Sequence, residues 1–147
     1  MRLRNAFGLA AILAVILSTS ALAATEKAKM AGGVNVSSPC NGQLVTTTGN
    51  LLLEVATNPD GSITVKMQYK GLGADEDGVT FKTELNARET QTGSFPGTFS
   101  IAYTGEFAGK PPAQNFSVDG MVDVYVDANG VPTGASITSL NATCLAF

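Results

Sequence analysis

Few side chains in this sequence could do chemistry. The 147 residues include no His, no Trp and only two Cys. These absences argue against Ser–His–Asp triads, Cys–His pairs and the usual zinc, copper and haem ligand sets, because each of these needs His or a free Cys. Carboxylates, Lys, Ser, Thr and Tyr remain. The sequence therefore indicates no cofactor, and it favours, without deciding the matter, a protein that is not an enzyme.

Acidic side chains are the remaining candidates for acid–base catalysis. Two carboxylates at a suitable separation are enough for a glycoside hydrolase, and Glu54, Asp119 and Asp123 fall within expected strands. In those strands, however, they alternate with the apolar residues and so belong to the opposite face. We therefore expect them on a solvated outer face.

An acidic stretch has some of the spacing of a calcium-binding loop. Residues 73–84 place Asp75, Asp77 and Glu84 at positions three, five and twelve, but the first position holds Gly where Asp is needed. Because the flanks are strand-like, an EF-hand is excluded. A looser calcium site formed by Asp75, Glu76 and Asp77 stays open as an alternative, and we favour a solvated hairpin loop.

The two cysteines stand near the two ends of the expected domain. Cys40 and Cys144 most simply form a disulfide in an exported protein, and the alternative is two free thiols. A bridge that closes so long a loop is worth roughly 4–5 kcal/mol in the unfolded-state model.

Apolar and polar residues alternate most clearly in the β-hairpin expected over residues 58–88. A strand whose residues alternate with a period of two places its apolar face on a core and its polar face in water, as in an antiparallel sheet. The same pattern predicts six strands, over residues 43–57, 62–70, 79–92, 98–107, 116–126 and 133–144. The first is expected to bend at Gly49, with two strands joined there as the alternative. A change of parity between Ile137 and Leu140 predicts a β-bulge.

These strands predict an all-β fold, a single antiparallel meander of about six long strands. With an even number, the first strand begins and the last strand ends at the same end of the sheet. A Cys40–Cys144 disulfide needs Cα atoms within about 7 Å, which a flat sheet of six strands cannot provide. We therefore expect the sheet to curl into a barrel or sandwich.

The first residues have the pattern of a secretory signal. Arg2 and Arg4 precede an apolar run, and a small-residue pattern follows it, with cleavage expected after Ala23. The alternative is an uncleaved membrane anchor, for which the run is short. We expect a signal peptide over 1–23, a polar lead-in over 24–39 and an all-β domain over 40–147, in a secreted or periplasmic protein. The stretch 71–78 is expected to be a flexible connection.

The charge of the processed chain limits its partners. Removal of Arg2 and Arg4 leaves seven Lys and Arg against 12 Asp and Glu, a net charge of −5. An acidic chain without basic runs is unsuited to nucleic acid or anionic lipid. We therefore expect no nucleic-acid partner and no membrane association after signal cleavage.

Three short segments resemble a group of small secreted bacterial proteins with no assigned activity. They are the opening Cys-Asn-Gly-Gln-Leu-Val from Cys40, the connection over 71–81 leading to Arg88-Glu89-Thr90, and Asp-Ala-Asn-Gly from Asp127 followed by Cys144. The resemblance implies a secreted all-β protein and supplies no catalytic residue.

Two functions are consistent with the sequence. We favour an exported, non-enzymatic β-domain that binds or interacts. The alternative is a small barrel that carries or isomerises an apolar small molecule, in which Tyr69, Tyr103 and Arg88 are the candidates for facing the ligand. A cavity of several hundred Å³ would favour the alternative.

Overall fold

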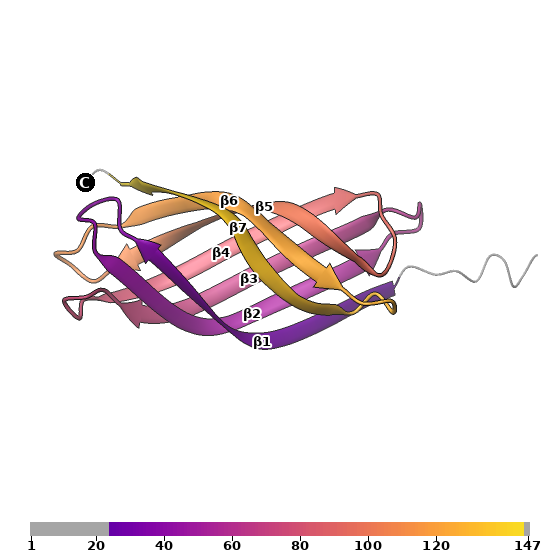
Figure 1. Ribbon diagram of the computed structural model, residues 1–147, viewed down its shortest axis with the longest axis horizontal. Coiled ribbons are helices and arrows are strands. Elements are labelled where there is room, and N and C mark those ends of the chain that lie inside the picture. The colour runs from indigo at the N-terminus through magenta and orange to yellow at the C-terminus, as the bar shows by residue number, and fades with distance from the viewer. Residues whose placement is uncertain (1–23, 146–147) are drawn as a thin grey trace, which may run out of the picture.

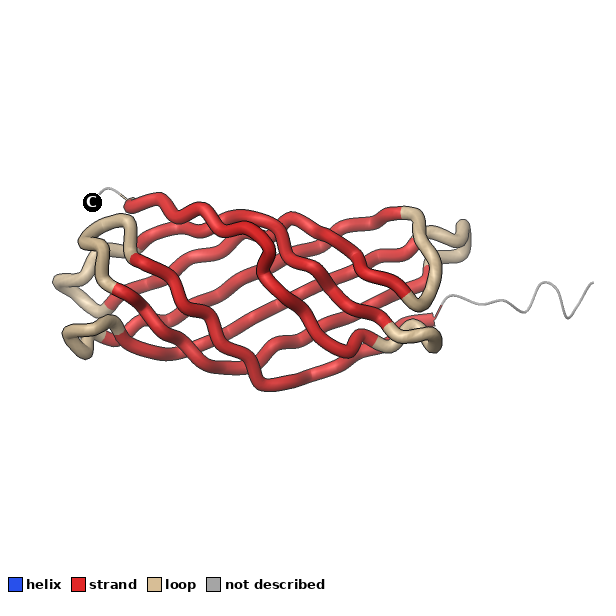
Figure 2. Tube along the Cα trace, in the orientation of Figure 1, coloured by secondary structure: helices blue, strands red, loops and turns tan. Residues whose placement is uncertain are grey.

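A computed structural model of the chain describes residues 24–145 and shows seven antiparallel strands in one sheet. The strands follow one another in sequence order, so the sheet is a meander without crossovers (Figures 1 and 2). Their bounds are β1 (Ala24–Ser37), β2 (Leu44–Thr57), β3 (Ile63–Ala74), β4 (Thr80–Gln91), β5 (Gly97–Gly109), β6 (Phe116–Val126) and β7 (Pro132–Cys144). Residues 24–145 include no helix long and apolar enough to cross a membrane. The expected signal over 1–23 lies outside the described residues.

The sheet curls into a half-barrel, as the elongated, rolled outline in Figure 2 shows. Alternate side chains of each strand point inward and form one hydrophobic core. Toward one end of this core, the rings of Phe107 and Phe116 stack with centroids 4.8 Å apart, and Phe81 packs against Phe116 at 6.0 Å. The all-β meander expected from the alternation is confirmed.

The disulfide between Cys40 and Cys144 is present, with Cα atoms 5.1 Å apart. Cys40 lies in the loop between β1 and β2, and Cys144 is the last residue of β7. Six strands, β2 to β7, separate the two cysteines, so both lie at the same end of the sheet. The expectation that both cysteines lie at one end of the sheet is therefore confirmed, and so is the expected curl.

The expectation of a polar lead-in over 24–39, with a fold that begins at Cys40, is wrong. Residues of β1 pair with β2 along the whole strand, from Ala24 opposite Thr57 to Ser37 opposite Leu44. Val34 and Val36 are buried in the core. Most other inward positions of this strand hold small residues such as Ala28 and Gly32. The contrast between inward and outward residues is therefore weak, which explains why the alternation did not predict this seventh strand.

Gly49 lies within a single continuous strand, as expected. It stands opposite Gly71 of β3, and a Cβ on Gly49 would overlap the carbonyl O of Lys70. The two backbones therefore approach more closely than a side chain would allow, which permits a strong local bend of the sheet. Gly32 of β1 also faces Gly49, so glycines occupy one row across three strands.

The connection expected over 71–78 is shorter than the sequence indicated. Strand β3 continues to Ala74 and pairs with β4 as far as Thr80. A tight turn follows, in which Gly78 N–H donates to Asp75 O at 3.0 Å and Gly78 has φ of 81°. Residues 71–74 include two glycines and resemble a loop in composition, but they lie in the strand because their neighbours on β2 and β4 supply the hydrogen bonds.

The expected bulge in the last strand is also present. Met121 pairs with Ser139, whereas the next residue, Val122, pairs with Ile137. Thr138 is therefore the extra residue, and it changes the parity of β7 between Ile137 and Leu140.

Candidate functional site

The two edge strands, β1 and β7, lie at the two ends of the strand order and form no hydrogen-bonded ladder with each other in residues 24–145. Every neighbouring pair in the meander is antiparallel, so β1 and β7 run in the same direction. At their nearest points, Cα atoms of β1 and β7 come within 8 Å of each other. The curled sheet therefore has one seam.

A groove of about 560 Å³ opens at this seam, and we call it the seam groove. Residues 30–35 of β1 form one side, and residues 134–137 with Leu140 of β7 form the other. Its floor reaches into the core and is made by Leu51, Met67, Tyr69, Leu85 and Val122. The volume falls within the range of small-molecule pockets, about 300–1,000 Å³. The seam groove is therefore a place where an apolar molecule could reach core side chains.

Tyr69 is held in the floor by the glycine row and by a hydrogen-bond chain. A Cβ on Gly32 would lie 3.6 Å from Cε2 of Tyr69, so the ring packs beneath β1. The hydroxyl of Tyr69 is 3.1 Å from Oγ1 of Thr47, which donates to the carbonyl O of Val34 at 3.4 Å. With the Thr47 proton used in this way, Tyr69 is the donor to Thr47. These contacts fix the position of the Tyr69 side chain.

Tyr103 is buried but does not line the seam groove. Its hydroxyl donates to the carbonyl O of Ser139 on β7 at 2.9 Å, passing over Gly120 of β6. Burial, and to a lesser extent the nearby charge of Asp119, raises the pKa of Tyr103 to about 12. Tyr103 therefore holds β7, which forms one side of the seam groove, from the core side of the sheet.

Arg88 is exposed on the outer face of β4, opposite Lys66 of β3. It borders a separate outer hollow together with Leu52 and Glu54. Glu54 lies 3.8 Å from Lys66 and 4.0 Å from Lys27, so this part of the outer face is a charged surface. Of the three expected ligand-facing residues, the structure places only Tyr69 in the seam groove.

The other carboxylates singled out in the sequence also face outward. Asp119 is exposed on β6, and Asp123 accepts a hydrogen bond from the hydroxyl of Ser100 on β5. Neither lines the seam groove.

The acidic turn between β3 and β4 uses its carboxylates within the protein. Asp75 Oδ1 accepts from the backbone N–H groups of Asp77 and Val79, both at 2.9 Å. Glu76 accepts from Leu44 N–H at 3.1 Å, and Asp77 accepts from the side chain of Gln43. In the described part of the chain, no group of three or more potential ligands is arranged to hold a metal ion. The turn thus fastens the β1–β2 loop.

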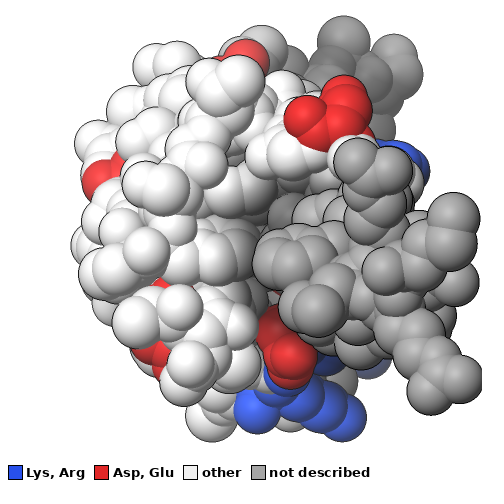
Figure 3. Space-filling model, turned by 90° about the vertical axis from the view of Figure 1, so that its right-hand side faces the viewer, with Lys and Arg blue, Asp and Glu red and all other residues white. Residues whose placement is uncertain are grey.

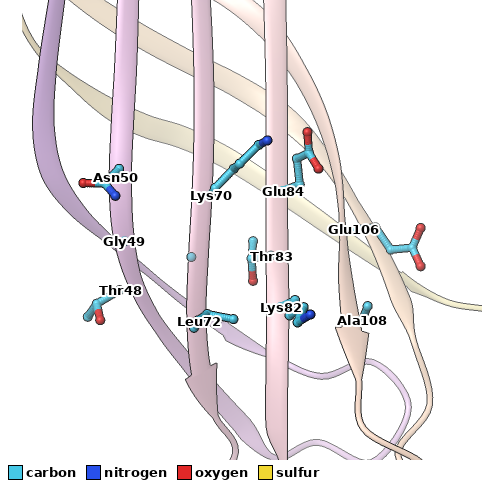
Figure 4. Close-up of a pocket in the computed structure, with 11 residues that line it drawn as sticks. Thr48, Gly49, Asn50, Lys70, Leu72, Lys82, Thr83, Glu84, Glu106 and Ala108 are labelled. Carbon is cyan, nitrogen blue, oxygen red and sulfur yellow. The ribbon is translucent and has the colours of Figure 1, made fainter.

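A second hollow, on the outer face of β2 to β5, has a different character (Figure 4). Its volume is also about 560 Å³, but charged side chains surround it. Figure 4 shows the ends of Lys70 and Glu84 directed toward each other, with Glu106 pointing away from both. The seam groove has no charged residue in its described lining and reaches core side chains, so it is the better candidate for an uncharged apolar molecule.

Figure 3 shows one end of the molecule, and on its visible described part acidic side chains lie apart from one another, with basic side chains beside one of them at the lower edge. Most of the visible described surface is uncharged.

Sequence reasoning missed the residues of β1 that form one side of the seam groove. Met30, Gly32, Val34 and Val36 share one parity, and this weak alternation is the signal that could have revealed the strand. The floor residues lie on the apolar faces of the expected strands, but their access to the surface depends on how two distant strands meet.

No family model matches the chain, and neither the curated proteins nor the solved structures searched contain a match. The resemblance to small secreted bacterial proteins therefore stays a prediction, and the site has to be interpreted from its own geometry.

Proposed function

We propose that the protein is an exported, non-enzymatic β-domain that binds a small apolar molecule in the seam groove. The observation that carries this proposal is the groove itself, a hollow of about 560 Å³ whose floor consists of core side chains such as Met67 and Leu85. The disulfide supports export, because such bonds persist in oxidising compartments.

Binding is favoured over isomerisation by the side chains available. Tyr69 is the one titratable residue among those lining the groove, and its hydroxyl is already engaged with Thr47. A proton-transfer reaction needs a positioned acid or base with a pKa suited to the working pH. The groove lining supplies hydrophobic surface and fixed polar groups instead.

A small molecule is also favoured over an inserted peptide strand. A strand placed between β1 and β7 would hold them about 10 Å apart, twice the usual spacing between neighbours. The two edge strands approach within 8 Å at their nearest points. A complete extra strand would therefore have to force the seam open, whereas a small molecule can occupy the hollow as it stands.

The test is binding of N-phenylnaphthylamine, a neutral apolar fluorophore, to the folded protein. We expect saturable binding with enhanced fluorescence. Ala135→Phe places a large side chain at the groove and should weaken binding by about tenfold or more, because it removes hydrophobic contact area. Ala102→Phe, a matched change at an exposed position of β5, should leave binding unchanged. Equal effects of the two variants, or no saturable binding, would refute the proposal.

A further inference from the structure

We infer that the seam groove selects apolar molecules that carry an uncharged hydrogen-bonding group, and that it discriminates against carboxylates and ammonium ions of the same length. This inference rests on the proposed function and specifies its ligand. The observation behind it is electrostatic: among the described residues that line the groove, none is Asp, Glu, Lys or Arg.

The absence of charge extends along β7 and along β1 from Met30 onward. Residues 30–53 contain no charged residue, and neither do residues 128–147, in a chain in which 14% of residues are charged. The nearest charge on β1, Lys29, is exposed and belongs to the outward-facing parity of the strand. Among the residues that line the groove, a charged head group therefore finds no side chain of opposite charge.

Burial makes that lack costly. Tyr69 and Met67 in the floor are 2% and 4% exposed, so the floor already lies out of water, and a group that settles against it between β1 and β7 gives up part of its own hydration. Moving an ionised group out of water without a partner is far more unfavourable than moving a hydroxyl or amide that finds a hydrogen bond. The groove thus penalises an ion more than a neutral group of similar size.

Neutral hydrogen-bonding groups are nevertheless present. Six consecutive residues, 30–35, line one bank, so the edge of β1 itself faces the groove rather than one set of its side chains. Half of the backbone N–H and C=O groups of an edge strand point away from its one partner. The Asn35 amide lies on the β1 side of the groove, and the Ser136 hydroxyl lies on the β7 side. A pure hydrocarbon would cover these groups without pairing them, whereas a hydroxyl or carbonyl can pair with them.

The first experiment compares three probes of equal chain length at pH 7. Dodecanol, dodecanoate and dodecylammonium, each below its micelle-forming concentration, compete with N-phenylnaphthylamine for the folded protein. We expect dodecanol to displace the fluorophore at a concentration at least about tenfold lower than either ion.

The second experiment supplies the missing charge. Ser136 stands opposite Asp123 of β6, whose carboxylate would pair with a new ammonium group, so the variant is made together with Asp123→Asn. In that background, Ser136→Lys places an ammonium group on the exposed β7 side of the groove and should improve dodecanoate binding about tenfold, with dodecanol little changed. Ser136→Gln in the same Asp123→Asn background adds length without charge, is the matched control and should not improve dodecanoate binding.

The outcomes separate this inference from the proposed function. If neither the fluorophore nor any alkyl probe binds, the proposed function fails, and the inference fails with it. If the fluorophore binds but dodecanoate or dodecylammonium competes as well as dodecanol, the inference is overturned while the proposed function stands. Equal gains in dodecanoate binding from Ser136→Lys and Ser136→Gln would also overturn it.

Discussion

Cys40 and Cys144 are 104 residues apart in the sequence, and their Cα atoms lie 5.1 Å apart in the structure. Their disulfide joins the loop that follows β1 to the end of β7. It therefore links the two strands that border the seam groove, at the end of the half-barrel where both strands finish. The bond holds a seam that no backbone ladder closes in the described chain.

Removing this link should cost most of the stability that loop closure provides. For the double variant Cys40→Ala plus Cys144→Ala, we expect the free energy of unfolding to fall by about 4 kcal/mol. Urea denaturation of the folded, oxidised parent and of the variant measures the difference. A loss below about 1 kcal/mol would mean that the seam is held by other contacts.

The Tyr69 hydroxyl should contribute a measurable hydrogen bond. Tyr69→Phe leaves the ring beneath Gly32 but removes the donor to Thr47, so we expect the free energy of unfolding to fall by about 1 kcal/mol. Tyr125→Phe is the control, because Tyr125 is 41% exposed on the outer face. If both variants lose the same stability, the buried hydroxyl pair has no special role.

Tyr103 gives the fold a predictable sensitivity to alkali. Its pKa is raised from 10.0 to about 12 in the folded state, so the protonated form is favoured by folding. The resulting stability is fully present below about pH 10 and is lost as the pH rises toward about 12. Urea denaturation across this interval should show a decline that Tyr103→Phe reduces. The same decline in Tyr103→Phe would assign it to other groups.

The glycine row should tolerate side chains unequally. Gly49→Ala would drive a Cβ into the carbonyl O of Lys70, so we expect a loss of about 2 kcal/mol or more in the free energy of unfolding. Gly32→Ala meets Leu51 and Tyr69 at an ordinary 3.6 Å and should change stability by no more than about 0.5 kcal/mol. Thermal or urea unfolding of the two variants makes the comparison. Equal tolerance at both positions would show that the backbones at Gly49 can separate freely.

Much of the fold follows from local patterns in the sequence. Val45, Leu53 and Val55 keep one parity through Gly49, and the parity change after Ile137 marks the bulge that the structure contains. The curl followed from a different argument, since a bond between Cys40 and Cys144 cannot span a flat sheet.

The first strand escaped prediction because several of its inward positions hold small or charged residues. Ala28 and Gly32 carry too little hydrophobicity to distinguish β1 from a loop, and its pairing with β2 supplies the order that the sequence does not reveal. The groove could not be predicted for a further reason. It forms where residues near 32 meet residues near 135, and no local period encodes that meeting.

The central claim is that an apolar molecule binds at the seam between β1 and β7. The most direct measurement is an NMR titration of isotope-labelled protein with dodecanol, following each backbone amide. We expect saturable shift changes at residues 30–35 and 134–137 and at Tyr69, with little change at Lys82 and Ala108 on the outer face. Changes confined to the outer hollow, or no saturable change anywhere, would contradict the account.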